Sequence, residues 1–394
     1  MMLRAAMARR LGQPCVHVPS ARLGLYLALR HWTRPGDRVL IAPTNCETVL
    51  FTALAAGLEP VMAPVSIRDG NIDPARVDYR GLACVVTTHL YGQPDRIVEL
   101  EAACRERGLV LVDDAAHALG VQVAGRPLGT FGDVGVLSLA KHGRAMSGGF
   151  LTSADTARLA GAAGTLDTLL RPGTWHGHLR DLLRPMAREA VARAGLTGPV
   201  WQAMKATGLA SWGARWEGHR VAAREPELRA TLAMPLSDEN ARLSALDRWL
   251  RVDQAAWRTR QTAGLRRYQL TRLRTAERER GRRIVGVERL RATPWAADGV
   301  KEGLALPLLR VPLLVRQRDE VVRALERRGV VPGFIYDPPL SDYLALVRPG
   351  PAQAHARWWT RHVLPVDPLD AERVEALLTE LGVHPAPALH DVLA

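Results

Sequence analysis

The first 150 residues alternate short aliphatic runs with helix-like segments, and this alternation constrains the fold more than any other feature of the chain. Continuous apolar runs such as Leu82–Thr88 and Val134–Ser138 are typical of strands that are covered on both faces, as in a mostly parallel sheet. Further strands are expected at Arg38–Ala42, Pro60–Val65 and Leu109–Val112. The pattern therefore predicts βαβ units in an α/β domain.

Helix signals lie between and after these runs. Ser20 is expected to cap a helix over 20–32, and Asn45 a second helix that ends at Gly57. Beyond about residue 155 the pattern turns helical, with a long helix expected from Ser237 through Leu273. A smaller α+β region should follow, with strands in 304–315 and helices over 316–329 and 370–382.

Several classes of protein are disfavoured by composition. The apolar runs of this 394-residue chain are short and interrupted, and none approaches the roughly 18 apolar residues of a membrane span. The start MMLRAAMARRLGQP has arginines but no apolar segment after them, so no secretory signal is expected. The cysteines have no CxxC spacing, which favours a reducing cytoplasm over a disulfide framework; they are Cys15, Cys46, Cys84 and Cys104.

Most of the net charge of +13 lies in the middle of the chain, within and around an Arg/Trp-rich segment at about 170–230. This segment is interpreted as a helical cap over a site or dimer edge with solvated arginines, or as a surface for an anionic substrate such as a nucleotide diphosphate. Contact with anionic lipid through Leu179–Val191 is a weaker alternative, because Pro185 interrupts that helix. No nucleic-acid module accompanies the charge, so nucleic acid is not expected as a partner.

Lysine is rare in this chain, which holds only Lys141, Lys205 and Lys301 among its 53 basic residues. A lysine that persists in such a sequence points to chemistry that guanidinium cannot perform. Lysine can lose its proton and attack a carbonyl, whereas arginine stays protonated.

Three polar clusters stand at the ends of predicted strands, where open α/β sheets bind their ligands. The first contains Ser20, whose hydroxyl and adjacent helix amides could hold a phosphate or simply cap the helix. The second contains Asp114 and His117. A buried carboxylate needs a cation, such as a protonated pyridine nitrogen, although an aspartate that caps a turn gives the same pattern. The third delivers Ser138 and then Lys141 into a glycine-containing loop.

Seven stretches carry a family resemblance in their order and separations. They are PSARLGLYLAL, PGDRVLIAPTNCETV, NIDP, THLYGQPDRIVELEAACRERGLVLVDDAAHALG, GTFGDVGVLSLAKHGRAMSGGFL, YDPPL and VLPVDP. Together they resemble the DegT/DnrJ/StrS family of pyridoxal-phosphate sugar aminotransferases over nearly the whole chain. LVDDAAHALG followed by GTFGDVGVLS is the most specific part.

The resemblance implies the fold type I architecture. A large domain over residues 1–235 would hold a mostly parallel seven-stranded sheet flanked by helices, with a smaller C-terminal α+β domain over 236–394. It also implies a cytoplasmic homodimer with pyridoxal 5′-phosphate as cofactor. Such an enzyme moves an amino group, in this case from glutamate, to a keto-sugar that is expected to be nucleotide-linked, in polysaccharide or secondary-metabolite biosynthesis.

The same resemblance implies roles for individual residues. Lys141 would bind the cofactor aldehyde covalently and later move protons, and Asp114 would pair with the pyridinium nitrogen. The other implied contacts are with the cofactor phosphate, from Ser20, Ala21 and Ser138, and with the cofactor ring, from Ala116 and His117.

Three departures from the family pattern are visible. The spacing from Ser138 to Lys141 is three residues rather than five, a form found in a subset of the family. Cys46 and Glu47 occupy the place of the aromatic residue that usually stacks on the ring, for which His117 is a substitute candidate. The GxNxR segment by which a neighbouring subunit reaches the phosphate is not recognisable in LSDEN, which ends at Asn240.

Two alternatives follow from these departures. One is a sugar dehydratase that uses the same cofactor and has histidine in place of the lysine, since His142 lies next to Lys141. The other is a catalytically silent family member with a binding or regulatory role.

Overall fold

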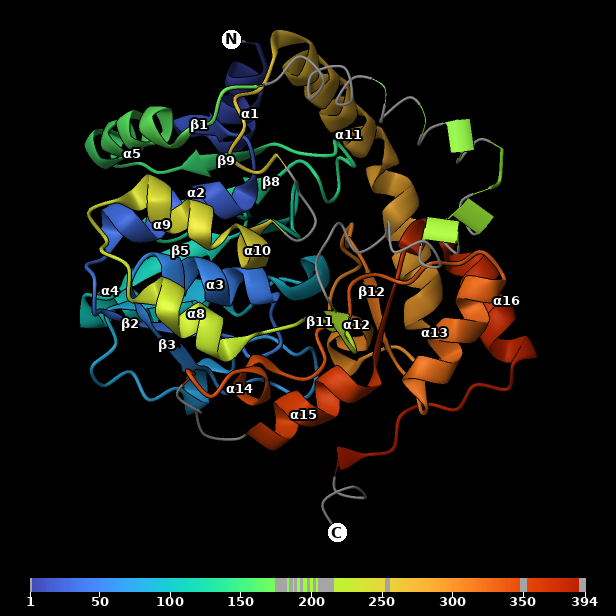
Figure 1. The fold of residues 1–394 in the computed structure, drawn as a ribbon. Coiled ribbons are helices and arrows are strands. Elements are labelled where there is room, and N and C mark those ends of the chain that lie inside the picture. Colours follow the sequence, from blue (N-terminus) through green and yellow to red (C-terminus); the bar gives the residue numbers. More distant parts are fainter. Residues whose placement is uncertain are drawn as a thin grey trace.

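The computed structural model describes residues 2–173, 216–251, 256–347 and 353–389, with isolated residues between 183 and 204. A seven-stranded sheet lies at its centre in the order β1-β9-β8-β5-β4-β2-β3 (Figure 1). The pairs from β8 to β3 are parallel, and β9 runs antiparallel to β1 and β8, so the predicted, mostly parallel α/β sheet is confirmed. The strands are β1 (Cys15–Val18), β2 (Arg38–Ile41), β3 (Glu59–Met62), β4 (Cys84–Thr87), β5 (Val110–Asp114), β8 (Val134–Ser138) and β9 (Gly149–Thr152).

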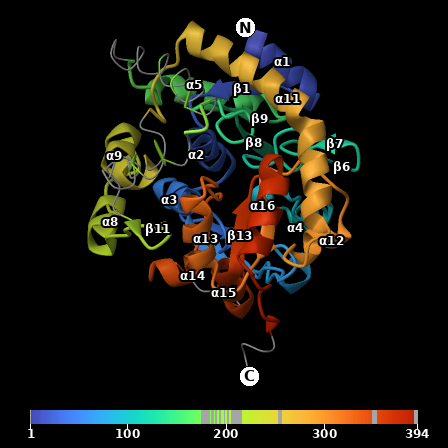
Figure 2. The same cartoon turned by 90° about the vertical axis from the view of Figure 1, so that its right-hand side faces the viewer.

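Helices cover both faces of this sheet, which explains its continuous apolar strands. One face packs on α2 (Ala21–Trp32), α3 (Glu47–Ala55) and α5 (Thr156–Leu169) through a buried cluster that includes Val112 and Val136. The other face packs on α1 (Met2–Leu11), α4 (Ile97–Arg107) and α11 (Ala263–Arg291) through Leu111 and Leu137. The helices α1 and α11 lie side by side (Figure 2).

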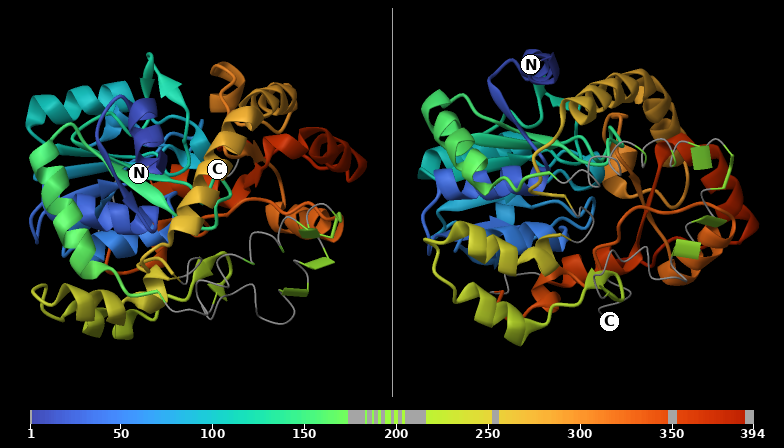
Figure 3. Two further views of the ribbon diagram at one scale, coloured as in Figure 1. Left: turned by 90° about the horizontal axis from the view of Figure 1, so that it is seen from above. Right: turned by 45° about the horizontal axis from the view of Figure 1, so that its top comes forward.

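A third buried cluster belongs to the C-terminal part of the chain. Its antiparallel pair β12 (Val311–Leu314) and β13 (Val363–Val366) is flanked by α13 (Arg318–Arg327), α15 (Gln353–His362) and α16 (Ala371–Glu380), as Figure 3 shows from two directions. The remaining elements are α8 (Glu225–Leu232), α9 (Glu239–Ala245), α10 (Asp247–Leu250), α12 (Asp298–Glu302), α14 (Leu340–Tyr343), the hairpin β6 (Gln122–Val123) and β7 (Arg126–Pro127), and the pair β10 (Trp216–Glu217) and β11 (Arg220–Val221).

The expected helix start at Asn45 is wrong by one residue. The N-cap of α3 is Cys46, and no side chain caps it. Asn45 instead accepts a hydrogen bond from the Cys46 N–H and donates to Thr88 Oγ1 at 2.5 Å. Its side chain therefore joins the ends of two strands rather than capping a helix.

The single helix expected from Ser237 through Leu273 is also wrong. This stretch forms α9, α10 and the start of α11, with residues 256–262 outside any helix. Trp249 and Trp257 are buried in the core cluster that also contains α2 and α3, and the Trp257 indole donates to Asp247. Packing of these two indoles in the core outweighs the helical spacing of apolar residues that predicted one continuous helix.

The Arg/Trp-rich segment, including Leu179–Val191, lies largely outside the described residues, so its interpretations stay predictions. Among the described helices, none is both long and apolar enough to cross a membrane.

Candidate active site

The predicted site residues gather at one edge of the sheet. The strands β1, β8, β5, β4, β2 and β3 all point their carboxyl ends to this edge, because β9 is antiparallel to both β1 and β8. Ser138 pairs with Gly149 across the sheet, and a Cβ on Gly149 would lie 3.0 Å from Ala21 N. Asp114 pairs with Val136 on the neighbouring strand. The fold thus brings together segments that are more than 120 residues apart in sequence, such as those of Ala21 and Gly149.

Lys141 lies in the tight loop between β8 and β9. Its Nζ is 4.7 Å from the centroid of the Phe334 ring, where an ammonium interacts favourably with the aromatic face. The next residue, His142, is buried, and its Nε2 donates to the carbonyl of His117 at 2.8 Å. The loop that holds Lys141 is therefore tied to the segment that follows Asp114.

Asp114 is buried at the end of β5, and its Oδ1 accepts a hydrogen bond from Ala116 N at 3.0 Å. Burial raises the pKa of Asp114 to about 7; the Ala116 N–H and the charge of Lys141 oppose this rise only in part. The carboxylate has too few donors to stabilise its charge in this low-dielectric position. A cationic N–H placed beside it would keep it ionised.

His117 is buried with its ring nearly parallel to the rings of Tyr91 and Tyr336, at interplanar angles of 9° and 12°. Its Nδ1 accepts from the Tyr91 N–H at 3.3 Å, which places the ring proton on Nε2. Burial, together with the charge of Lys141, holds the pKa of His117 well below its usual range. The ring is therefore a neutral donor through Nε2.

The two predicted phosphate-binding hydroxyls differ. Ser138 is buried, and its Oγ accepts from Ala140 N at 3.3 Å, which leaves its hydrogen available to donate. Ser20 accepts from Leu23 N at 3.2 Å and donates to the Trp257 carbonyl at 2.9 Å. The Ser20 hydroxyl is thus already engaged, and a phosphate there would depend on helix amides such as Ala21 N.

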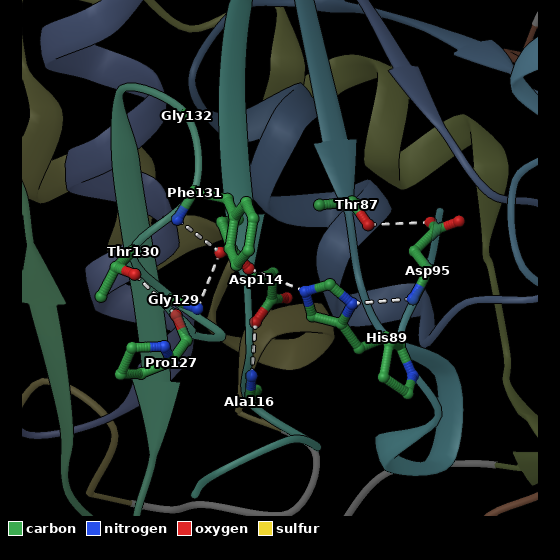
Figure 4. A network of polar contacts seen from close by, with 12 residues as sticks. Thr87, His89, Asp95, Asp114, Ala116, Pro127, Gly129, Thr130, Phe131 and Gly132 are labelled. Atoms are coloured by element: carbon green, nitrogen blue, oxygen red, sulfur yellow. Dashed lines mark hydrogen bonds and ion pairs between the residues drawn. The ribbon is translucent and has the colours of Figure 1, made fainter. Parts of the chain in front are cut away.

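A buried network behind Asp114 was not predicted as functional, although THLYG was part of the resemblance. His89 Nδ1 accepts from Asp95 N at 2.9 Å, so its Nε2 carries the proton and donates to Asp113 at 2.8 Å. Asp113 also accepts from the Gly129 and Phe131 amides at 2.7 and 3.0 Å. Figure 4 shows His89 between Asp95 and the carboxylates at the end of β5. The network fixes the strand end from which Asp114 projects.

Residues from the C-terminal part close the site from the other side. Tyr336 lies beside Tyr91 with ring centroids 5.9 Å apart, and the Tyr91 hydroxyl donates to the Phe334 carbonyl at 2.9 Å. Cys46 is half-buried in the same apolar cluster, in the place where the family has an aromatic residue. YDPPL, which begins at Tyr336, was one of the stretches that carry the resemblance, but no role was assigned to it because these contacts depend on tertiary packing.

The N-x-R half of the GxNxR pattern is present as Asn240 and Arg242, with Asp238 at the glycine position. Asp238 caps α9, and Arg242 is buried and donates to the carbonyls of Leu54 and Ala55 at the end of α3. Within this chain Arg242 therefore anchors α9 on α3.

These residues fit pyridoxal phosphate. The buried carboxylate of Asp114 requires a cationic partner, the Ser138 hydroxyl has a hydrogen to donate, and Lys141 contributes to the electrostatic environment of both Asp114 and His117. An amine near a carboxylate that prefers a protonated heterocycle is the arrangement that this cofactor needs.

Comparison with known proteins agrees with the fold and the motifs. Residues 5–165 match the sequence model of the DegT/DnrJ/EryC1/StrS aminotransferase family. A crystal structure of DesI in the presence of its TDP-sugar product has a TM-score of 0.63 and 21% identity, over 96% of this chain and 83% of that one. The match over residues 5–165 agrees with the family predicted from the motifs, and the likeness to this structure confirms the predicted fold.

Curated relatives are similar over shorter stretches. GDP-perosamine synthase of Vibrio cholerae is 31% identical over 130 residues, which cover 32% of this chain and 33% of that protein. UDP-N-acetyl-3-dehydro-alpha-D-glucosamine 3-aminotransferase of Acidithiobacillus ferrooxidans is 30% identical over 166 residues, covering 40% and 44%. A dTDP-4-dehydro-2,6-dideoxy-D-glucose 3-dehydratase of Saccharopolyspora spinosa is 32% identical over 108 residues, which cover 27% of this chain and 23% of that protein. The chain thus spans less than half the length of the curated relatives it matches.

Proposed function

We propose that this protein is a pyridoxal-phosphate-dependent aminotransferase that moves an amino group from glutamate to a nucleotide-linked keto-sugar. It would act as a cytoplasmic homodimer in the synthesis of a surface polysaccharide or a glycosylated metabolite. The observation that carries the proposal is the placement of Lys141 and the buried Asp114 at one edge of the sheet. The names of the sugar aminotransferases among its relatives support the substrate class.

Pyridoxal phosphate, when bound, supplies an electron sink that stabilises negative charge on the substrate carbon. The chain's own share is to hold and orient the reacting groups. Asp114 Oδ2 would hold the heterocycle's nitrogen in its protonated form, and the Ser138 hydroxyl would donate to the phosphate. The Lys141 amine would attach the cofactor and, once released from it, move a proton at Nζ.

The low-dielectric surroundings strengthen these interactions. Asp114 and His117 are buried, and a charge pair out of water interacts more strongly than one at the surface. His117 would stay uncharged beside the ring, because its pKa is depressed by burial and by Lys141. A neutral imidazole avoids placing a second cation next to the pyridinium, so the full negative charge of Asp114 is available to it.

The geometry favours the lysine over the adjacent histidine as the reacting group. Lys141 Nζ lies over Phe334 at the edge where the predicted site residues meet, whereas His142 Nε2 is engaged by the His117 carbonyl. A dehydratase in which histidine replaces the lysine would need His142 to break this hydrogen bond. A catalytically silent protein could have the same site geometry, so only an activity measurement separates it from an aminotransferase.

The two half-reactions can be tested separately. Cofactor-loaded protein mixed with L-glutamate should lose the visible absorbance of the bound cofactor and release 2-oxoglutarate, and a nucleotide-linked keto-sugar should restore the absorbance. Lys141→Ala should do neither, while Lys301→Ala, at a surface position, should behave as wild type. Tight cofactor binding with no response to glutamate would support the silent alternative, and loss of a sugar hydroxyl without amine incorporation would support the dehydratase.

A further inference from the structure

A cavity of about 220 Å³ lies apart from the site described above. It lies between α1, α11, the β6–β7 hairpin and the face of β8 opposite α2, is partly open to solvent, and none of the predicted cofactor-binding residues lines it. Its apolar wall is made of Met7, Leu11, Leu128, Leu137 and Leu273. An apolar cavity of about 150 Å³ is enough to bind benzene, so this one has room for a ring with a small substituent.

Two buried polar side chains in its wall have unused hydrogen-bonding capacity. Arg283 is 2% exposed, and its Nε has no hydrogen-bond partner within the described part of the chain. His142 is 4% exposed and donates from Nε2 to the His117 carbonyl, which leaves its Nδ1 as an acceptor. A buried guanidinium N–H without an acceptor is unfavourable, so an acceptor atom of a ligand would stabilise this wall.

The charges around the cavity favour an anion. Its wall contains Arg10, Arg280 and Arg283 against a single acid, Glu277. Arg10 pairs with Glu277 at 2.6 Å and Arg280 donates to the Gly120 carbonyl. Arg283 Nη1 shares Asp367 with Arg310 and Arg144, so three arginines surround that one carboxylate. Among the residues that line the cavity, arginines therefore outnumber acids three to one, and Glu279 is a further acid close to Arg283.

We propose that this cavity binds a small organic carboxylate with an apolar body, about the size of an aromatic acid. The apolar wall would contact the body of the ligand, and Arg283 Nε–H would donate to its carboxylate. The site is independent of the proposed aminotransfer, although His142 connects it through one hydrogen bond to His117.

Benzoate and its neutral isostere benzamide are suitable probes. We would titrate each into full-length, cofactor-saturated protein and follow binding by ligand-observed NMR. Benzoate should bind saturably, in the millimolar range expected for so few atoms, and about tenfold more tightly than benzamide. Cofactor saturation would occupy the ring and phosphate positions at the sheet edge, and the cavity variants described next distinguish benzoate in this cavity from benzoate in the place of the amino donor.

Variants on α11 locate the binding. Ala276→Phe should fill the cavity and abolish benzoate binding, whereas Val285→Phe, which adds the same ring at a 69% exposed position of the same helix, should leave it unchanged. Gln122→Trp narrows the cavity from the β6–β7 hairpin and repeats the test if Ala276→Phe does not fold. Equal binding of benzoate and benzamide, no saturable binding, or benzoate binding that survives these cavity variants would overturn the proposal.

Discussion

The protonation of one side chain, Asp114, controls what this site can bind. Burial makes the Asp114 carboxylate costly to ionise and raises its pKa to about 7. The folded chain without cofactor therefore favours the protonated carboxyl below that pH. A protonated heterocycle beside it would reverse that preference. Asp114 therefore favours the binding of a group that presents a positively charged N–H.

Asp114 should make the cofactor-free protein less stable as pH rises. Its pKa of about 7 in the folded chain lies above the ordinary value of 3.8, so between these values the folded state binds more protons than the unfolded state. Stability from this group is thus present below about pH 4 and is lost as the pH rises to about 7. Across this pH range the melting temperature of Asp114→Asn should fall less than that of the wild type. Part of the fall should remain, because burial also raises the pKa of Asp95, to about 6. An unchanged pH profile in Asp114→Asn would contradict the assignment.

The strand-end residues were predictable from the sequence, and their neighbours were not. Lys141, Ser138 and Asp114 follow apolar runs whose carboxyl ends must share one edge of a parallel sheet. Tyr336 and Phe334 reach the same edge from nearly 200 residues further along the chain, and no periodicity reports that contact. The roles of the strand-end residues themselves stay predictions.

At the scale of elements, the turn after β4 brings the backbone of β4 close to the end of β5 and to the C-terminal part. His89 and Tyr91 have positive φ values of 47° and 58°, and Gly92 has φ 92°. A Cβ on Gly92 would lie 2.7 Å from the His117 carbonyl and 2.8 Å from Leu309 N. This turn therefore sets how closely the β5 end approaches the C-terminal part.

Gly92→Ala should destabilise the protein by about 2–3 kcal/mol or more, because it combines an unfavourable φ with a clash against backbone atoms. Gly108→Ala is the matched control: its φ is 64°, but nothing lies within 4 Å of the added Cβ, so it should cost only about 1 kcal/mol. Urea unfolding measures both. Equal losses for the two variants would show that the close approach at Gly92 is not important.

Helices and strands whose apolar residues follow one clear spacing were predicted well, whereas a stretch that folds into several helices was not. The strand over Val134–Ser138 has the predicted bounds, and Ser20 caps α2 as expected. The stretch 237–273 contains no proline and one glycine, so its sequence gives little sign that it is divided into α9, α10 and α11. Burial of Trp249 and Trp257 against the core decides the path of the chain there.

At the scale of the whole molecule, Arg220 joins the sheet edge to the C-terminal part. It is 1% exposed, pairs with Glu47 at 2.9 Å and donates to the carbonyls of Asn45, Tyr336 and Pro338. These contacts hold Tyr336 against the site. Removing only one member of a buried ion pair is costly, because the other charge then stays buried without a partner.

Arg220→Met should destabilise the protein by about 3–5 kcal/mol, and adding Glu47→Gln should restore part of the loss because no buried charge is then left unpaired. Arg229→Met, which breaks an exposed pair with Glu225, should change the stability by less than about 1 kcal/mol. Chemical denaturation of the four variants forms the cycle and its control. A double variant as unstable as the sum of its singles would contradict a direct pair.

The most direct test of the central claim is to find which amine holds the cofactor. Borohydride treatment of the cofactor-loaded protein makes the linkage permanent, and peptide mass mapping then locates it. The chain contains only three lysines, so Lys205 and Lys301 serve as internal controls. The cofactor's added mass is expected on the peptide that contains Lys141 and on neither of the others; an adduct at Lys205 or Lys301, or no adduct, would show that Lys141 is not the reacting amine.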